Sequence, residues 1–181
     1  KPTNIEDIIF FLKKVKPKKI SIIGAGSNTL IRDGGVKGIT IKLSSHFSYL
    51  NLTSLNIIEV GAATLDKKIA NFALENSLTG LEFLSCIPGS IGGALRTNSG
   101  CYGQDISQIL HSIKVIDING NKKDILASEI NFYYRGSNLD QNLIIISVKL
   151  QGIPSLKEKI KKKQQTLIEK KKKSQPNQIK T

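Results

Sequence analysis

IPGSIGGALRTNSGCYG, residues 87 to 103, is the stretch around which the 181-residue chain is organised. It holds five glycines among small polar side chains. Glycine accepts positive φ angles and lets a ligand approach the main chain, but it is costly in unfolded-state entropy. The stretch therefore predicts open backbone outside the core. It is either a plain loop between two elements or a ligand-binding loop.

A second glycine-rich stretch, residues 24–35, reads GAGSNTLIRDGG and directly follows a predicted strand, Lys19–Ile23. A strand that enters Gly-x-Gly suggests a dinucleotide-binding fold, which needs a third glycine, a following helix and an acid about 20 residues later. Position 29 is threonine, Asp33–Gly35 interrupts any helix, and Ser44–His46 contains no acid. All three requirements fail, so the sequence excludes the Rossmann fingerprint.

The start of this second stretch, Gly24 to Asn28, still predicts a tight turn. Its backbone amides, together with the Ser27 hydroxyl and the Asn28 amide, form a nest suited to a phosphate. A plain strand-to-turn corner is the alternative. If both glycine stretches bind, two turns from two lobes face one extended ligand between them.

Composition favours a globular protein without a membrane segment. Hydrophobic residues make up 39% of the chain, and no apolar run approaches the ~18 residues that span a bilayer. The length allows one sizeable core or two small lobes that share one. Two cysteines, Cys86 and Cys101, predict reduced thiols in a cytosolic protein, with a reactive thiol beside the central stretch as the less favoured alternative. The two isolated histidines predict no metal-ligand cluster.

The formal net charge of +13 suggests a nucleic-acid partner, but its distribution argues against one. Residues 157–173 hold nine lysines against two glutamates, so a charge of +7 belongs to one segment. No aromatic side chain interleaves with these lysines, as a surface that stacks bases requires. We interpret the segment as the solvated face of a helix.

Arginine is scarce: among 27 basic residues only Arg32, Arg96 and Arg135 are arginine, each in a stretch of interest on other grounds. A guanidinium is planar, always charged and able to donate two parallel hydrogen bonds to carboxylate or phosphate. The three positions therefore support anion binding without deciding it.

The pattern of apolar residues predicts an α+β protein. The predicted elements are a helix Ile5–Val15 capped by Thr3 or Asn4 and ended by Pro17, strands Lys19–Ile23, Gly38–Leu43, Ile57–Val60, Ile113–Ile118 and Leu143–Leu150, a hairpin turn Asn119-Gly120, a helix from about Leu65 to Asn76 with Leu65, Ile69, Phe72 and Ala73 on its apolar face, and a lysine-rich helix opened by Pro154 and ended by Gln175-Pro176. We expect a small lobe, residues 1–45, a larger lobe, residues 46–153, and the lysine-rich helix, residues 154–181.

Three motifs together, Gly24–Gly35, Gly80–Gly100 and Tyr134-Arg135, resemble those of the UDP-N-acetylenolpyruvoylglucosamine reductase (UDP-N-acetylmuramate dehydrogenase) family, in residues, order and spacing. The resemblance covers essentially the whole chain. It implies a two-lobed FAD-binding domain of the vanillyl-alcohol-oxidase (PCMH) type, in a cytoplasmic bacterial enzyme of peptidoglycan precursor synthesis. In that family NADPH reduces the flavin, which delivers hydride to the enolpyruvyl group of a UDP-sugar. The product is UDP-N-acetylmuramate, and no nucleic-acid or membrane partner is implied.

The resemblance also implies which residues form the site. The implied cofactor-binding residues are Gly24, Ala25, Gly26, Ser27 and Asn28 at the FAD pyrophosphate, and Pro88, Gly89, Ser90, Gly92, Gly93, Asn98 and Gly103 at the flavin end. Arg135 matches the catalytic arginine, and Tyr134 and Arg135 are the implied substrate-binding pair. Hydride addition builds negative charge next to the substrate carboxylate, and a fixed guanidinium stabilises it.

The family's proton-donating serine and its catalytic glutamate belong to a further C-terminal domain, which the 181 residues do not include. The chain also starts at Lys1 without a methionine. We therefore expect a fragment that does not complete turnover alone. Two alternatives remain: another FAD-dependent oxidoreductase of the same fold, such as a sugar or alcohol oxidase, and a basic nucleic-acid-binding module that uses the lysine-rich helix and Phe132–Arg135.

Overall fold

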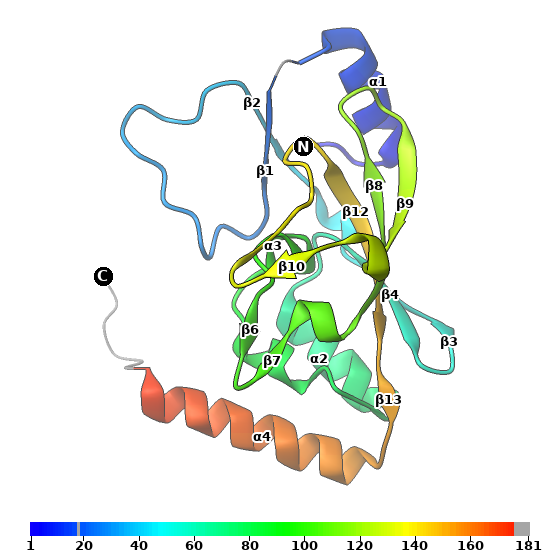
Figure 1. Cartoon of the computed structure of the whole chain (residues 1–181), viewed down its shortest axis with the longest axis vertical. Helices are drawn as coiled ribbons and strands as arrows, with labels where there is room; N and C mark the ends of the chain where they lie inside the picture. Colours follow the sequence, from blue (N-terminus) through cyan, green and yellow to red (C-terminus); the bar gives the residue numbers. More distant parts are fainter. Residues whose placement is uncertain (18, 176–181) are drawn as a thin grey trace.

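The computed structural model describes residues 1–17 and 19–175 (Figure 1). Its helices are α1 (Ile5–Val15), α2 (Asp66–Glu75), α3 (Ile91–Arg96) and α4 (Lys157–Ser174), with short 3-10 turns η1 (Ser45–Phe47), η2 (Glu82–Cys86), η3 (Ile106–Gln108) and η4 (Ala127–Glu129). Its strands are β1 (Ile20–Ile23), β2 (Ile39–Lys42), β3 (Leu50–Ser54), β4 (Ile57–Gly61), β5 (Leu78–Thr79), β6 (Gly100–Cys101), β7 (Gln104–Asp105), β8 (Leu110–Ile116), β9 (Lys122–Leu126), β10 (Phe132–Tyr133), β11 (Gly136–Ser137), β12 (Ile144–Gln151) and β13 (Ile153–Pro154).

The centre of the fold is a five-stranded antiparallel sheet in the order β3-β4-β12-β8-β9. The predicted turn at Asn119-Gly120 joins β8 and β9, and Gly120 has a φ of +85°. Asp117 fixes this turn, because its Oδ1 accepts hydrogen bonds of 2.8 Å from the backbone N–H groups of Asn119 and Asn121. The predicted hairpin is therefore confirmed.

Strand β12 is buried on both faces, as its run of β-branched residues predicts. Ile144 and Ile146 pack into a smaller core with α1, β1 and β2. Ile145, Val148 and Leu150 pack into a larger core with α2, α3 and η2. A change of register between Ile145 and Ser147 accompanies this division. One strand thus separates two cores and belongs to both.

Helix α1 has the predicted bounds, and its cap is Asn4, whose side chain accepts a 2.7 Å hydrogen bond from the N–H of Asp7. Ile8 and Leu12 are its buried residues. It covers the smaller core above β1 and β2, which form a separate parallel pair. Between these two strands a long exposed loop extends away from the rest of the molecule (Figure 1).

The apolar face predicted for α2 is confirmed except at Leu65: Ile69 and Ala73 are buried, and Phe72 packs partly buried against the larger core. Asp66, Ile69, Ala70 and Ala73 are the buried residues of α2, whereas Leu65 precedes the helix and is 44% exposed. The prediction that Leu65 packs into the core was therefore wrong. The physical reason is that Leu65 is the residue before the helix and has an extended backbone, so its side chain does not follow the helical spacing.

The prediction that residues 87–103 are open backbone outside the core was wrong for their middle part. Ile91–Arg96 forms α3, and both Ile91 and Leu95 are 0% exposed. The apolar residues Ile91, Ala94 and Leu95 are spaced three and four apart, so one face of this short helix packs into the larger core despite Gly92 and Gly93.

Helix α4 lies across the end of the molecule opposite α1 (Figure 1). It packs through Ile160, Gln164 and Leu167, and its lysines face mostly outward. Pro154 lies in β13 rather than at the helix start, and Pro176 falls outside the described residues. No helix among the described residues is long and apolar enough to cross a membrane. The division into lobes at residues 45 and 153 stays a prediction.

Candidate cofactor site

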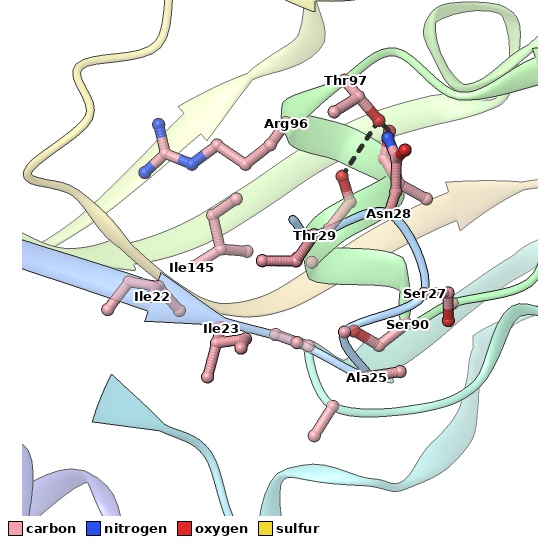
Figure 2. Close-up of a pocket in the computed structure, with 18 of the residues that line it drawn as sticks. Ile22, Ile23, Ala25, Ser27, Asn28, Thr29, Ser90, Arg96, Thr97 and Ile145 are labelled. Atoms are coloured by element: carbon pink, nitrogen blue, oxygen red, sulfur yellow. Dashed lines mark hydrogen bonds between the residues drawn. The ribbon is translucent and has the colours of Figure 1, made fainter. Parts of the chain in front are cut away.

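A cavity of about 540 Å³ opens where β1 ends, beside the start of α3. Both glycine stretches line it. Figure 2 shows Ala25, Ser27 and Ser90 gathered at one end. The predicted residues along its wall are Gly24, Ala25, Gly26, Ser27, Asn28, Pro88, Gly89, Ser90, Gly92 and Gly93. The structure thus brings together two segments that are more than 50 residues apart in sequence.

The turn at the end of β1 offers unused hydrogen-bond donors to this cavity. Gly26 has a φ of +83°, and nothing lies within 4 Å of the position that a Cβ would take there. Within the described part of the chain, residues 25–28 donate no backbone hydrogen bond to another residue. A turn with positive φ and free amides is the arrangement that binds an anion.

The facing turn, Pro88 to Ser90, is held rigidly by an isolated bridge to Leu65. The N–H of Asp66 donates to Gly89 O at 3.1 Å, and the N–H of Ile91 donates to Thr64 O at 3.0 Å. Gly89 has a φ of +150°, which a side chain would disfavour. The two turns approach closely, because a Cβ on Gly24 would lie 2.5 Å from Ser90 Oγ. No larger residue fits at position 24 without movement.

Apolar side chains form a further part of the cavity wall: Ile22, Ile23, Leu43, Ile87 and Ile145. Figure 2 shows Ile22 and Ile145 on the side away from Ser27 and Ser90. Apolar walls with a few polar groups at one end suit a ligand that has a flat ring system and a charged tail. Sequence reasoning missed this wall, because these residues belong to two strands, β1 and β12, and to the segments that follow β2 and η2.

Arg96 lies beside this cavity but its guanidinium points away from it, toward the segment 139–143 (Figure 2). It donates to Leu139 O at 3.2 Å, to Asp140 O at 2.7 Å and to Leu143 O. Burial lowers the pKa of Arg96, and the nearby Asp140 carboxylate raises it. Three of the five guanidinium N–H donors of Arg96 therefore bind backbone carbonyl oxygens, which gives it a structural role. The expectation that Arg96 supports anion binding stays a prediction.

Asp66 lines the cavity and was also missed by the sequence reasoning. It is 0% exposed, and neither carboxylate oxygen has a hydrogen-bond partner among the described residues. Burial raises the pKa of Asp66 to about 7. The signal was present in the sequence, since an acid stands at helical spacing with Ile69, Ala70 and Ala73.

The remaining predicted residues lie in a second, more open hollow of about 510 Å³. Asn98, Gly103, Tyr134 and Arg135 line it, together with Asp105 and others. Asn98 connects its walls, because its Oδ1 accepts from Ser107 N at 3.1 Å and its Nδ2 donates to Tyr133 O at 3.5 Å. The predicted site residues therefore fall into two groups.

Arg135 occupies the turn between β10 and β11 with a φ of +61°, which is unusual for a residue with a side chain. Its guanidinium carbon lies 5.4 Å from the centre of the Tyr134 ring. Tyr134 is itself 87% exposed. A strained backbone that presents a charged side chain at a hollow is typical of functional sites.

Cys86 and Cys101 are both free thiols at the two ends of the central glycine stretch. Burial and the neighbouring Cys86 thiol raise the pKa of Cys101 to about 11. Cys86 is only 6% exposed. Both facts disfavour a reactive thiol in this region, since the thiolate is the nucleophile. No group of three or more His, Cys, Asp or Glu side chains suited to a metal ion occurs among the described residues.

Comparison with known proteins identifies relatives over the full length of the chain. A family described as FAD binding domain matches residues 1–125. The UDP-N-acetylenolpyruvoylglucosamine reductase of Pelagibacter ubique is 45% identical over 100% of this chain and 60% of its own length. That of Wolbachia sp. subsp. Brugia malayi is 42% identical over 100% of this chain and 61% of its own length. The chain thus spans about 60% of these relatives.

Solved structures agree with this result. The UDP-N-acetylenolpyruvylglucosamine reductase from Thermus caldophilus superposes with a TM-score of 0.84 at 28% identity, covering 96% of this chain and 62% of that chain. A Cu,Mo-CO dehydrogenase superposes with a TM-score of 0.62 at 12% identity over 85% of this chain and 58% of that chain, and shows the fold alone. The resemblance stated from the three motifs and the α+β fold of the PCMH type are confirmed.

Proposed function

This chain belongs to the FAD-binding domain family, and we propose that it binds FAD in the 540 Å³ cavity between its two glycine turns. One observation supports this assignment above all: residues 25–28, whose amides donate no hydrogen bond within the described residues, and the Gly89 turn line one cavity that also has apolar walls. A dianionic pyrophosphate and a flat ring system match these two parts of the cavity in charge and in polarity.

In this proposal each turn has its own role. Gly24, Ala25, Gly26, Ser27 and Asn28 hold the pyrophosphate, and Pro88, Gly89, Ser90, Gly92 and Gly93 enclose the part of FAD next to it. Asn98 and Gly103 lie at the second hollow, where they position the backbone near the reacting end of the ring. The bound FAD supplies the hydride chemistry, and the protein supplies position and electrostatics.

We further propose that the whole protein reduces UDP-N-acetylglucosamine enolpyruvate to UDP-N-acetylmuramate, with NADPH as the reductant. The similarity to UDP-N-acetylenolpyruvoylglucosamine reductases over the full chain supports this activity. The chain spans about 60% of the length of those relatives, so this activity is proposed for the whole protein. With a nucleotide sugar as substrate and a nicotinamide as reductant, we propose that the activity is cytoplasmic.

Arg135 is the proposed catalytic residue, and Tyr134 the neighbouring substrate contact. When hydride reaches the enolpyruvyl group, negative charge develops on the carbon next to the carboxylate. A guanidinium held in place by its turn and by the Tyr134 ring stabilises that charge without rearrangement.

The visible absorbance spectrum of the purified chain tests the cofactor assignment. The chain is incubated with FAD, desalted and measured, with circular dichroism as a check that it is folded. We expect retained flavin bands. A folded chain that stays colourless, and leaves the fluorescence of added FAD unchanged, would reject the proposed cavity as an FAD site.

The proposed role of Arg135 is tested by the Arg135→Lys variant of the whole protein. Single-turnover mixing of the reduced holoenzyme with the enolpyruvyl UDP-sugar isolates the hydride-transfer step. We expect this step to slow by at least ten-fold while FAD content stays the same, since lysine cannot reproduce the planar guanidinium. An unchanged rate would remove Arg135 from the chemical step.

A further inference from the structure

The carboxyl group of Asp66 is buried in the fold without a hydrogen-bond partner among the described residues. Its side chain is fully buried at the start of α2, and neither Oδ1 nor Oδ2 has a hydrogen-bond partner among the described residues. A buried polar group without a partner is costly, and a buried charge more so. Native proteins therefore rarely keep such a carboxyl unless a ligand or another group satisfies it.

The position of this carboxyl is fixed by its neighbours. The Asp66 N–H is bonded to Gly89 O at 3.1 Å, and Oδ2 lies against Gly89, where an added Cβ would be only 3.4 Å away. Ser90 follows, and its Oγ is 2.5 Å from the position of a Cβ on Gly24. A short path of contacts thus leads from Asp66 through Gly89 and Ser90 to the first residue of the phosphate nest.

The charges around Asp66 do not provide a partner either. Among the described residues the ion pairs are Lys122–Glu6 and Lys163–Glu82, so no lysine or arginine pairs with Asp66, although Lys19, Lys42 and Arg96 also line the cavity. Arg96 is committed to three carbonyl oxygens, and Lys163 to Glu82. Burial is the cause that raises the pKa of Asp66, with no compensating charge.

The chemistry of a carboxyl limits what it binds here. A carboxylate accepts hydrogen bonds and repels phosphate, so its partner must be a donor. In FAD the groups attached directly to the pyrophosphate are the ribityl chain and the ribose, both of which carry hydroxyls. The imide N–H of the ring and the adenine amino group lie at the far ends. A group next to the nest therefore meets a sugar hydroxyl.

We propose that Asp66 accepts a hydrogen bond from a sugar hydroxyl of FAD beside the pyrophosphate, and that this contact is why the fold keeps an unpartnered carboxyl. The inference rests on the proposed FAD site and adds one binding residue to it. In this proposal Asp66 lowers the stability of the FAD-free protein and strengthens the binding of FAD in the complex. A purely structural carboxyl would stabilise both states.

The experiment compares wild-type chain with Asp66→Ala and Asp66→Asn, using flavin fluorescence to measure the FAD dissociation constant and thermal denaturation to measure the stability of the FAD-free chain. The exposed Asp124→Ala on β9 is the matched control. For Asp66→Ala we expect about ten- to one-hundred-fold weaker FAD binding, the loss of a hydrogen bond to a charged group. The FAD-free variant should melt at the same temperature as wild type or higher.

Asp66→Asn keeps the shape and one acceptor oxygen, so its loss of affinity should be smaller, and it serves if the alanine variant does not fold. FAD analogues that lack one ribityl hydroxyl or one ribose hydroxyl identify the hydroxyl that Asp66 binds. The analogue that lacks this hydroxyl should bind the wild-type chain more weakly than FAD does. The same analogue and FAD should bind the Asp66→Ala variant equally well. If the wild-type chain binds every such analogue as tightly as it binds FAD, the proposed contact with a hydroxyl is overturned.

Two results separate this inference from the proposed function. If wild-type chain does not bind FAD, both fall together. If it binds FAD and Asp66→Ala binds equally well, only the role of Asp66 is overturned. A parallel fall in FAD affinity and in the stability of the FAD-free chain would make Asp66 a structural residue and would also overturn the inference.

Discussion

The Nζ of Lys163 on α4 lies 3.1 Å from Oε2 of Glu82, whose side chain is only 1% exposed. Glu82 is further held by the Thr79 hydroxyl and by the Gly80 N–H at 2.9 Å. This pair, with Lys171 Nζ donating to Cys86 O at 2.7 Å, ties α4 to the 3-10 turn that precedes the central glycine stretch. Two of the lysines in the basic segment therefore have structural partners.

Replacing Lys163 by glutamine should lower the free energy of unfolding by about 1–3 kcal/mol, because Glu82 is left buried with its charge less well compensated. Urea denaturation measures the difference. The exposed neighbour Lys162→Gln is the control and should change stability by less than about 0.5 kcal/mol. Equal effects of the two substitutions would mean that the ion pair contributes nothing measurable.

Gly24→Ala should weaken FAD binding by about three- to ten-fold, because its Cβ would lie 2.5 Å from Ser90 Oγ and would force that hydroxyl of the cavity wall into another rotamer. Gly34→Ala is a matched control in the same loop, since nothing lies within 4 Å of its Cβ position. Fluorescence titration with FAD compares the two. Equal affinities would show that FAD binding does not depend on the position of the Ser90 hydroxyl.

Arg96→Lys should destabilise the chain by about 1–3 kcal/mol, since a single ammonium cannot reach the three carbonyl oxygens that the guanidinium reaches. Hydrogen exchange should show faster opening of residues 139–143 in the variant. Unchanged exchange there, combined with weaker FAD binding, would instead assign Arg96 to the ligand.

The stability of the FAD-free chain should depend on Asp66 with a defined sign. Its pKa is raised from 3.8 to about 7 in the folded state, so the unfolded chain loses this proton first as the pH rises. The contribution of the protonated Asp66 to the free energy of unfolding is therefore fully present below about pH 4, is lost between about pH 4 and 7, and stays lost above about pH 7. Wild type should lose several kcal/mol relative to Asp66→Asn across this range. A constant difference between the two from pH 4 to 8 would contradict the raised pKa.

The two thiols should resist alkylation in the folded chain. Burial holds the pKa of Cys101 at about 11, so only about one thiol in a thousand is ionised at pH 8. Iodoacetamide labelling followed by mass spectrometry should be slow in buffer and fast in concentrated urea. Rapid labelling of Cys101 in buffer would point to an opening of the central stretch that the structure does not contain.

Elements with a strong local pattern could be predicted from the sequence. Helix α1 has its predicted bounds because a cap, an apolar spacing and Pro17 agree there. The hairpin at Asn119-Gly120 and the buried strand β12 follow from turn chemistry and from β-branched residues. By contrast β3 (LNLTS) is mostly exposed and mixes polar and apolar residues, so nothing in its sequence distinguishes it from a loop.

Parts of the site that depend on tertiary contacts could not be predicted. The partners of Arg96 lie 43 to 47 residues away in sequence, and no local pattern relates them. Asp66 was overlooked because an acid at the first turn of a helix is usually a favourable exposed residue. The meeting of the two glycine turns was anticipated only through the resemblance and through the order of the elements.

The position of β12 between the two cores has a consequence for synthesis. Its residues 144–151 complete both cores at once, yet they lie late in the 181-residue chain. As the chain leaves the ribosome, α1, β1, β2 and the first glycine turn emerge before this strand. Neither core can be complete until residues 144–151 have been made, so we expect the two cores to be finished together rather than one lobe at a time.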